Sequence, residues 1–161
     1  MSPFEEIYSE NYHKMHRVAI KILGDNDNAC DIVQEIFLYL FERLNNGIEI
    51  LNISGWLYKA TVNKCMDNLR TKKRFHSIDS ASHVIVDVEF PDKEEAIAAV
   101  NLAMKKLNPR EKVLLVLYSE GLSYKDISES TGMKFSSIGK SLSRSLDKLE
   151  KELKNNHYEM Y

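Results

Sequence analysis

Three helix-start signatures constrain the fold of this chain more than any other feature of its sequence. They are Ser2-Pro3-Phe4-Glu5, Asn108-Pro109-Arg110-Glu111 and Ser123-Tyr124-Lys125-Asp126. In each, the first side chain can accept a hydrogen bond from a backbone N–H of the first turn, while the carboxylate three residues later reaches back to the first N–H. Proline at the second position of two signatures fits the first turn of a helix. The chain is therefore predicted to be built from capped helices.

Apolar side chains recur at three- and four-residue steps between these starts, which is the period of an amphipathic helix. Gly24 and Gly121 stand at the ends of such runs, where glycine often adopts the left-handed conformation that finishes a helix. In the last run, Ile138, Leu142 and Leu146 are assigned to the buried side. The predicted fold class is all-α. The expected helices cover about residues 3–23, 29–44, 56–74, 92–106, 109–120, 123–130 and 134–153.

Residues 75–92 break this pattern and divide the chain. They carry Ser, Asp, His, several Val and one Pro without helical period, so they are predicted to form a linker. A short strand over VIVDVEF is the alternative, but a strand without a partner is only marginally stable. The expected organisation is one small helical domain at 1–74 and a second at 93–161, joined by this linker.

The net charge of −2 hides a strong alternation along the chain. Six cations and one anion lie between Ser54 and His76, whereas six anions and one cation lie between Ser77 and Ala99. This distribution favours local contacts with a polyanion over a uniformly cationic surface. It also predicts weak binding to DNA by the isolated protein.

The segment from Leu122 to Leu149 is typical of a helix-turn-helix, because a short capped helix, a glycine-containing turn and a longer helix follow one another. The start of the longer helix is rich in cations and hydroxyls that can donate to base edges and phosphates. A helical hairpin with a solvated charged face is the alternative interpretation. The donors in question are Lys134, Ser136, Ser137, Lys140, Ser143 and Arg144.

A second nucleic-acid signal lies in the third expected helix. It combines Trp56 and Tyr58 with the amides Asn63 and Asn68, and it ends in the basic run 70–74. Cations attract phosphates, while aromatic and amide groups suit the unstacked bases of a single strand. Taken alone, Trp56 could equally belong to the core and the basic run could complement the helix dipole. One such surface in each half makes a coincidence less plausible.

Neither an enzyme nor a metal protein is indicated. His13 and His16 lack an H-E-x-x-H arrangement, and there is no glycine-rich phosphate loop or nucleophile elbow. No cofactor and no small-molecule substrate are therefore expected. Cys30 and Cys65 lack the close spacing of a metal or redox pair, which suits the reducing cytoplasm. No apolar run is long enough to predict membrane insertion.

Together these segments resemble a known family. DIVQEIFLYLFERL and WLYKATVNKCMDNLRTKKR in the first half, with LNPREKVLLVLYSEGLSYKDIS and TGMKFSSIGKSLSRSLDKL in the second, are similar in order and spacing to the two domain signatures of extracytoplasmic-function sigma factors of the sigma-70 superfamily. The resemblance implies a sigma factor that binds core RNA polymerase, directs it to promoter DNA and promotes strand opening. An anti-sigma factor is a further partner that the family admits.

Residue roles follow from this assignment. The acidic stripe of the second helix, which by itself could be a solvated face, corresponds to the part that docks on polymerase: Asp31, Gln34, Glu35 and Leu38. The third helix corresponds to the part that meets the minus-ten strand: Lys59, Asn63, Arg70, Lys72, Lys73 and Arg74. The loop 45–54 is expected beside a flipped base. The minus-thirty-five element is assigned to the last helix: Lys134, Ser136, Ser137, Gly139, Lys140, Ser143 and Arg144.

The chain departs from the family at three of these helix positions. Gly139 and Ser141 stand where relatives often carry a cation, and Val62 replaces a frequently basic residue. Promoter preference therefore cannot be copied from a relative. The alternative function is a conventional helix-turn-helix transcriptional regulator with an N-terminal ligand-binding or dimerisation domain. That alternative does not account for the aromatic, amide-rich and basic helix that closes the first domain.

Overall fold

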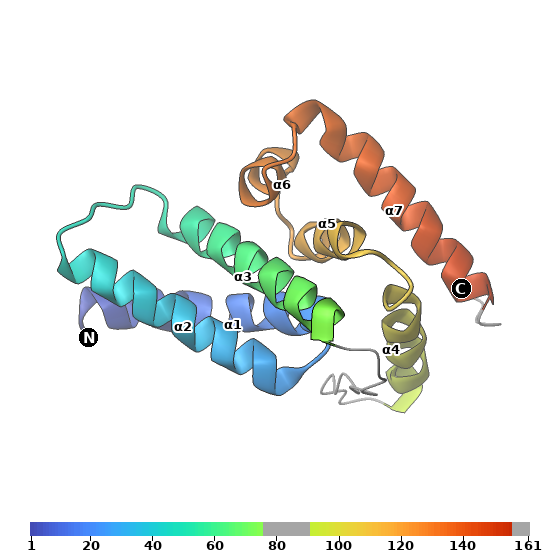
Figure 1. The fold of residues 1–161 in the computed structure, drawn as a ribbon, viewed down its shortest axis with the longest axis horizontal. Coiled ribbons are helices and arrows are strands. Elements are labelled where there is room, and N and C mark those ends of the chain that lie inside the picture. Colours follow the sequence, from blue (N-terminus) through green and yellow to red (C-terminus); the bar gives the residue numbers. More distant parts are fainter. Residues whose placement is uncertain (76–90, 156–161) are drawn as a thin grey trace.

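The computed structural model describes residues 1–75 and 91–155, and over these ranges it contains helices and no strands (Figure 1). The all-α prediction is confirmed. Most of the predicted linker, including VIVDVEF, lies outside the described residues, whereas its two ends belong to helices. The helices are α1 (Pro3–Leu23), α2 (Asn26–Asn45), α3 (Ile53–Phe75), α4 (Pro91–Met104), α5 (Pro109–Ser119), α6 (Tyr124–Thr131) and α7 (Phe135–Asn155).

The three predicted helix starts are present as capping boxes. At α1 the Glu5 N–H donates to Ser2 Oγ at 3.1 Å, and the Ser2 N–H donates back to Glu5 Oε2 at 3.4 Å. The same reciprocal pair opens α5 at Asn108 and α6 at Ser123. Gly132 follows α6 in the left-handed conformation with φ of 76°, as glycine does at many helix ends. Local sequence therefore sets where these helices begin and end.

Helices α1, α2 and α3 form a bundle around an apolar core. Met15 of α1, Val33 of α2 and Leu57 of α3 are completely buried. Helix α3 begins before the expected Trp56. The reason is Asn52, whose Oδ1 accepts the backbone N–H of Gly55 at 3.0 Å and so satisfies a donor of the first turn.

Helix α5 lies at the centre of the second half and is buried all round from Val113 to Leu117. The helical spacing of Val113, Leu114 and Leu117 predicts one apolar stripe, but Leu115 and Val116 are buried as well. Helix α7 packs on one side of α5, while α1 and α3 pack on the other. Figure 1 shows α5 between the N-terminal helices and α7. Neighbours on opposite sides of α5 cover more of its circumference than a single apolar stripe, which explains the additional buried residues.

The apolar stripe of α7 differs from the prediction at one position. Ile138 and Leu142 are buried as expected, but Leu146 is 42% exposed. Ser145 is buried instead, and its hydroxyl donates to the Ser141 carbonyl at 2.9 Å. Successive four-residue steps drift around a helix that has 3.6 residues per turn, so the buried face shifts from Leu142 to Ser145.

The two halves share one continuous core. Helix α1 contacts α5, and α3 contacts both α5 and α6. Buried residues of both halves, such as Met15 and Leu114, belong to the same apolar cluster. The sequence predicted two helical domains and gave no indication of this contact between them.

Candidate nucleic-acid interface

The exposed side of α3 carries the main residues assigned to the minus-ten strand. Lys59, Asn63 and Arg70 are solvent-exposed, and their helical spacing places them along one side. Val62, one of the departures from the family, is only 3% exposed. A lysine or arginine at this buried position would lose its hydration, so valine preserves the core here.

A groove with a volume of 670 Å³ runs between α2 and α3. Glu35 and Leu38 line it from α2, whereas Lys59 and Asn63 line it from α3. The fold therefore brings two residues assigned to polymerase docking together with two assigned to DNA.

Aromatic rings form part of this groove. The Tyr39 and Trp56 ring centroids are 5.9 Å apart in a stacked arrangement, and the Arg43 guanidinium lies 5.4 Å from the Tyr39 centroid. Tyr39 is 52% exposed. Trp56 is half-buried, so it contributes both to the core and to an open ring surface of the kind on which unpaired bases stack.

The basic end of α3 is less uniform than its sequence suggests. The Arg70 guanidinium pairs with Asp67 of the same helix. Lys72 Nζ lies 3.6 Å from Oδ2 of Asp25, the N-cap of α2, so Lys72 points toward the α1–α2 turn and away from Lys59, Asn63 and Arg70. The remaining two candidates belong to α3 but have side chains outside the described residues: Lys73 and Arg74.

The residues assigned to polymerase docking form one exposed stripe on α2. Leu38 is 63% exposed, and it stands among carboxylates and next to further exposed apolar side chains, Tyr39 and Phe41. Glu35 Oε2 lies 3.4 Å from Lys64 Nζ of α3, but both side chains are more than half exposed. Such a pair contributes little to stability, so the carboxylate stays accessible to a partner. The stripe consists of Asp31, Gln34, Glu35 and Leu38.

Sequence reasoning missed an aromatic surface next to this stripe. Phe4 and Tyr8 of α1 and Phe41 of α2 border a groove of 490 Å³ beside Leu38. The Phe4 and Phe41 ring centroids are 5.0 Å apart, edge to face, and Phe41 is 43% exposed. Their helical spacing predicts Phe4 and Tyr8 to lie on the apolar face of the first helix. The signal that could have indicated a partly open face is the recurrence of aromatic residues every four positions on both helices.

Helices α6 and α7 form the predicted helix-turn-helix. The Ser128 hydroxyl donates to the Met133 carbonyl at 2.6 Å and ties the turn to α6. Ile138 and Leu142 anchor α7 to the core. Most of the residues assigned to the minus-thirty-five element are exposed: Lys134 directly before α7, and Ser136, Lys140, Ser143 and Arg144 on α7. Two are half-buried: Ser137 and Gly139.

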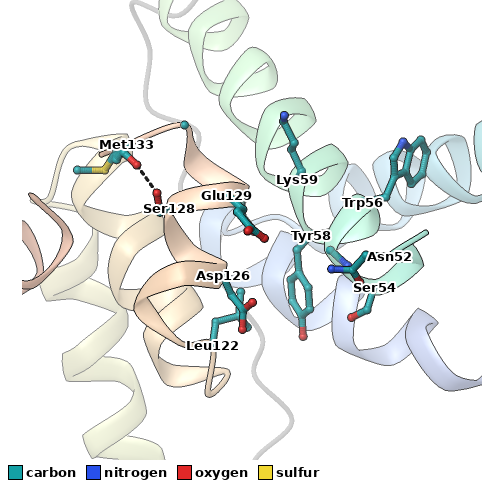
Figure 2. A pocket seen from close by; sticks show the side chains of 13 residues that line it. Asn52, Ser54, Trp56, Tyr58, Lys59, Leu122, Asp126, Ser128, Glu129 and Met133 are labelled. Atoms are coloured by element: carbon teal, nitrogen blue, oxygen red, sulfur yellow. Dashed lines mark hydrogen bonds between the residues drawn. The ribbon is translucent and has the colours of Figure 1, made fainter. Parts of the chain in front are cut away.

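A second groove, of 590 Å³, lies where the two halves meet (Figure 2). Tyr58 and Lys59 of α3 line one wall, and Asp126 and Glu129 of α6 line the other. The two carboxylates reduce the positive potential around Lys59, which borders both grooves. Burial, assisted by the nearby Glu120 carboxylate, raises the pKa of the Tyr58 hydroxyl above its ordinary value.

Glu120, directly after α5, is the principal polar link between the halves. Its side chain is 6% exposed, with Oε1 2.9 Å from Arg17 Nη2 and Oε2 3.3 Å from Lys21 Nζ. Burial alone would raise the pKa of the Glu120 carboxyl. The hydrogen bond from Arg17 and the charges of Lys21 and Arg17 outweigh burial and lower that pKa. Sequence reasoning did not find Glu120, because it stands 103 residues from Arg17.

Among the described residues, no group of three or more His, Cys, Asp or Glu side chains could hold a metal ion. His16 Nε2 lies 3.1 Å from Asn26 Oδ1 and 3.5 Å from Cys30 Sγ, so it serves the packing of α1 on α2. Burial raises the pKa of the Cys65 thiol to about 12, which makes that thiol unreactive at neutral pH. Over the same ranges, no helix is both long and apolar enough to span a membrane.

The sequence matches two family descriptions in order. Sigma-70 region 2 covers residues 7–75, which include nearly all of α1 to α3. Sigma-70, region 4 covers residues 97–149, which run from α4 into α7. Each match therefore coincides with one helical half of the fold.

Several known proteins are similar over most of the chain. ECF RNA polymerase sigma factor SigE of Mycolicibacterium smegmatis is 26% identical over 92% of this chain, which spans 61% of that protein's length. RNA polymerase sigma factor SigZ of Bacillus subtilis is 25% identical over 92% of this chain and 86% of its own. The sigma factor RpoE of Bartonella quintana, solved in complex with the anti-sigma factor NepR, has a TM-score of 0.79 at 20% identity, with coverage of 96% of this chain and 98% of that one.

Two helical units that each expose a helix suited to nucleic acid, matched in order by regions 2 and 4, define a transcription initiation factor. The chain belongs to the sigma-70 family of RNA polymerase sigma factors, in its extracytoplasmic-function (ECF) group. Members of this family are initiation factors rather than enzymes. A conventional helix-turn-helix regulator is not favoured, because region 2 accounts for the whole first half.

Proposed function

We propose that this sigma factor binds core RNA polymerase through the α2 stripe, captures the unpaired minus-ten strand on α3 and reads the minus-thirty-five element with α7. The main observation in support of this proposal is the groove between α2 and α3. Glu35 and Leu38 form its α2 wall, and Lys59 and Asn63 form its α3 wall. Contact with polymerase on one wall and with DNA on the other places the opened strand next to the enzyme that copies it.

The partner surface that fits the α2 stripe is basic and has an apolar depression. Asp31 and Glu35 supply negative charge, which steers and orients a cationic partner. Leu38 and the neighbouring Phe41 supply apolar area that is exposed in the free chain and can be buried on binding. This combination of a charged rim and an apolar centre is the usual anatomy of a protein interface.

The α3 side combines the groups that a single strand requires. The Asn63 amide offers a donor and an acceptor, so it can pair with a base edge that has lost its partner. Lys59 and Arg70 can hold flanking phosphates. The stacked Tyr39 and Trp56 rings offer a surface for a base delivered from the direction of the loop 45–54.

The polymerase interface is tested by charge reversal. Asp31→Lys together with Glu35→Lys is expected to weaken association with core polymerase more than about tenfold, because like charges then face each other. The circular dichroism of the variant should be unchanged, since both side chains are exposed. Glu10→Lys with Asp147→Lys, which reverses two other exposed carboxylates, is the matched control and should bind normally. Unaltered affinity of the first variant would remove polymerase binding from α2.

Two further experiments concern partners. Stable co-purification with core polymerase and promoter-dependent transcription in vitro separate a sigma factor from a conventional regulator, which binds DNA without replacing the initiation factor. The proposal places this activity in the cytoplasm with the polymerase and the promoter.

An anti-sigma factor is also proposed as a partner, by analogy with RpoE of Bartonella quintana. Such a partner would act by covering the α2 stripe or the exposed side of α3.

A further inference from the structure

A large apolar side chain stands at the start of the helix that reads DNA. Phe135 is the first residue of α7 and is 60% exposed. Its neighbours Lys134 and Ser136 are exposed as well, and they belong to the set assigned to the minus-thirty-five element. A phenylalanine so open to water is not explained by the core of the second half, which α7 reaches through Ile138 and Leu142.

Gly139 lies one turn further along the same side of α7, because residues four apart share a helix face. A Cβ atom at Gly139 would lie 3.4 Å from Cε2 of Tyr124, an ordinary van der Waals distance, and no other atom of the molecule outside its own helix is as near. The Tyr124 ring, at the start of α6, is itself 42% exposed. The Tyr124 ring beside Gly139 and the Phe135 ring one turn away on the same side of α7 leave apolar surface exposed to solvent, and we call these three residues the α7 notch.

Charged groups around the α7 notch indicate its occupant. Lys134 directly before α7, and Lys140 and Arg144 on α7, are exposed. Cations at this density suit the phosphates of a nucleic-acid duplex and would repel a basic protein surface. In the major groove of a DNA duplex, the C5-methyl of thymine is the apolar group that a side chain such as Phe can contact.

We propose that the α7 notch selects thymine at one position of the upstream promoter element by contact with its 5-methyl group. This inference rests on the proposed entry of α7 into the major groove. Gly139 offers no donor where relatives often carry a cation, so recognition at this step uses apolar contact instead of a hydrogen bond. Tyr124 and Phe135 supply the walls, and the missing side chain of Gly139 supplies the room for the methyl group.

Replacement of thymine by deoxyuridine tests the proposal, because it removes the methyl group and leaves base pairing intact. Holoenzyme reconstituted from core polymerase and the full chain is titrated with promoter duplexes that carry deoxyuridine at each thymine of the upstream element in turn. At one position, the deoxyuridine substitution should weaken binding by the wild-type holoenzyme about fourfold, the factor expected for the loss of one buried methyl group. Phe135→Ala should bind the thymine and deoxyuridine duplexes equally.

Control variants separate this contact from other effects. Tyr118→Ala removes another exposed aromatic ring, on α5 and outside the notch, and should retain the full preference for thymine. Phe135→Leu keeps an apolar side chain and should retain part of the preference. Lys134→Ala should weaken all duplexes alike, as expected for loss of a phosphate contact. Because Phe135 is mostly exposed, its replacement should leave the helical circular dichroism unchanged.

The experiment distinguishes an error in the proposed thymine contact from an error in the proposed function. If scrambling the upstream element does not change holoenzyme binding, α7 does not read DNA and both proposals are overturned. If binding depends on the upstream sequence but no deoxyuridine substitution weakens it, only the notch is overturned. The same holds if Phe135→Ala keeps the preference for thymine.

Discussion

Asn63 is the residue at which the proposed strand capture can be tested most directly. It is exposed on α3 between Lys59 and Arg70 and lines the groove between α2 and α3. Asn63→Ala removes its amide without disturbing the core, so binding to polymerase and closed-complex formation should persist. Strand opening should fall about fivefold, because a hydrogen bond of about 1 kcal/mol is lost. Permanganate reactivity of promoter thymines measures this opening.

A pre-melted promoter and a second variant control this experiment. Transcription from a promoter with an open bubble should suffer less, since the opening is already supplied. Asn155→Ala, which removes an exposed amide at the end of α7, should open duplex promoters normally. If Asn63→Ala also opens them normally, the role in melting belongs to another residue of the groove or of the loop 45–54.

At the scale of single elements, the capping boxes give a quantitative prediction. Asn108 Oδ1 accepts a hydrogen bond from the Glu111 N–H at 2.9 Å, and the Glu111 carboxylate accepts one from the Asn108 N–H. The same carboxylate lies 2.9 Å from Lys148 Nζ of α7. Asn108→Ala should therefore lower the free energy of unfolding by about 1 kcal/mol, the usual effect of losing an N-cap. Urea denaturation measures the change. Ser9→Ala, an exposed serine inside α1, is the control, and an equal effect of both variants would contradict the capping role.

The elements were predictable where local chemistry decides them. Capping boxes at Ser2, Asn108 and Ser123 placed three helix starts directly, and the apolar period placed the bodies of the helices. The first turn of α3 was missed because its donor is satisfied by Asn52, which stands in a loop without a recognisable box. Leu146 was misassigned because a four-residue step does not follow a helical face for long.

The DNA and polymerase candidates were predictable as sets on helices, but their environment was not. The sequence placed Lys59, Asn63 and Arg70 along one side of a helix, and the structure exposes all three. It did not reveal that Lys72 pairs with Asp25, because that ion pair depends on how α3 crosses the α1–α2 turn. Pairings of this kind depend on helix packing, which hydrophobic period alone does not determine.

For the molecule as a whole, the contact between the halves is the feature that the sequence did not predict. Glu120 and Arg17 meet although 103 residues separate them, and no local pattern connects them. One signal was available in the run from Val113 to Leu117, which is apolar all round and so required neighbours on more than one side. Those neighbours are α7 on one side and α1 and α3 on the other.

Glu120→Gln measures what the ionic part of this contact contributes. The substitution keeps the shape of the side chain and removes the charge that pairs with Arg17 and Lys21. At pH 7 the free energy of unfolding should fall by about 1–2 kcal/mol, a value suited to a charge-assisted hydrogen bond whose partners are half exposed. Urea denaturation of the full chain gives this difference. Glu129→Gln, which alters an exposed carboxylate of α6, should change stability much less.

The pH dependence of the difference in unfolding free energy between wild type and Glu120→Gln shows whether the ion pair causes it. The folded-state pKa of Glu120 lies below the ordinary carboxyl value of 4.5. Its contribution is therefore fully present above that value and is lost as the pH falls through the lowered folded-state pKa. Wild type and Glu120→Gln should differ at pH 7 and converge in acid, where the wild-type carboxyl is protonated and no longer pairs with Arg17. A difference that stays constant down to the lowest pH at which the chain folds would show that the variant disturbs packing between α1 and α5 rather than an ion pair.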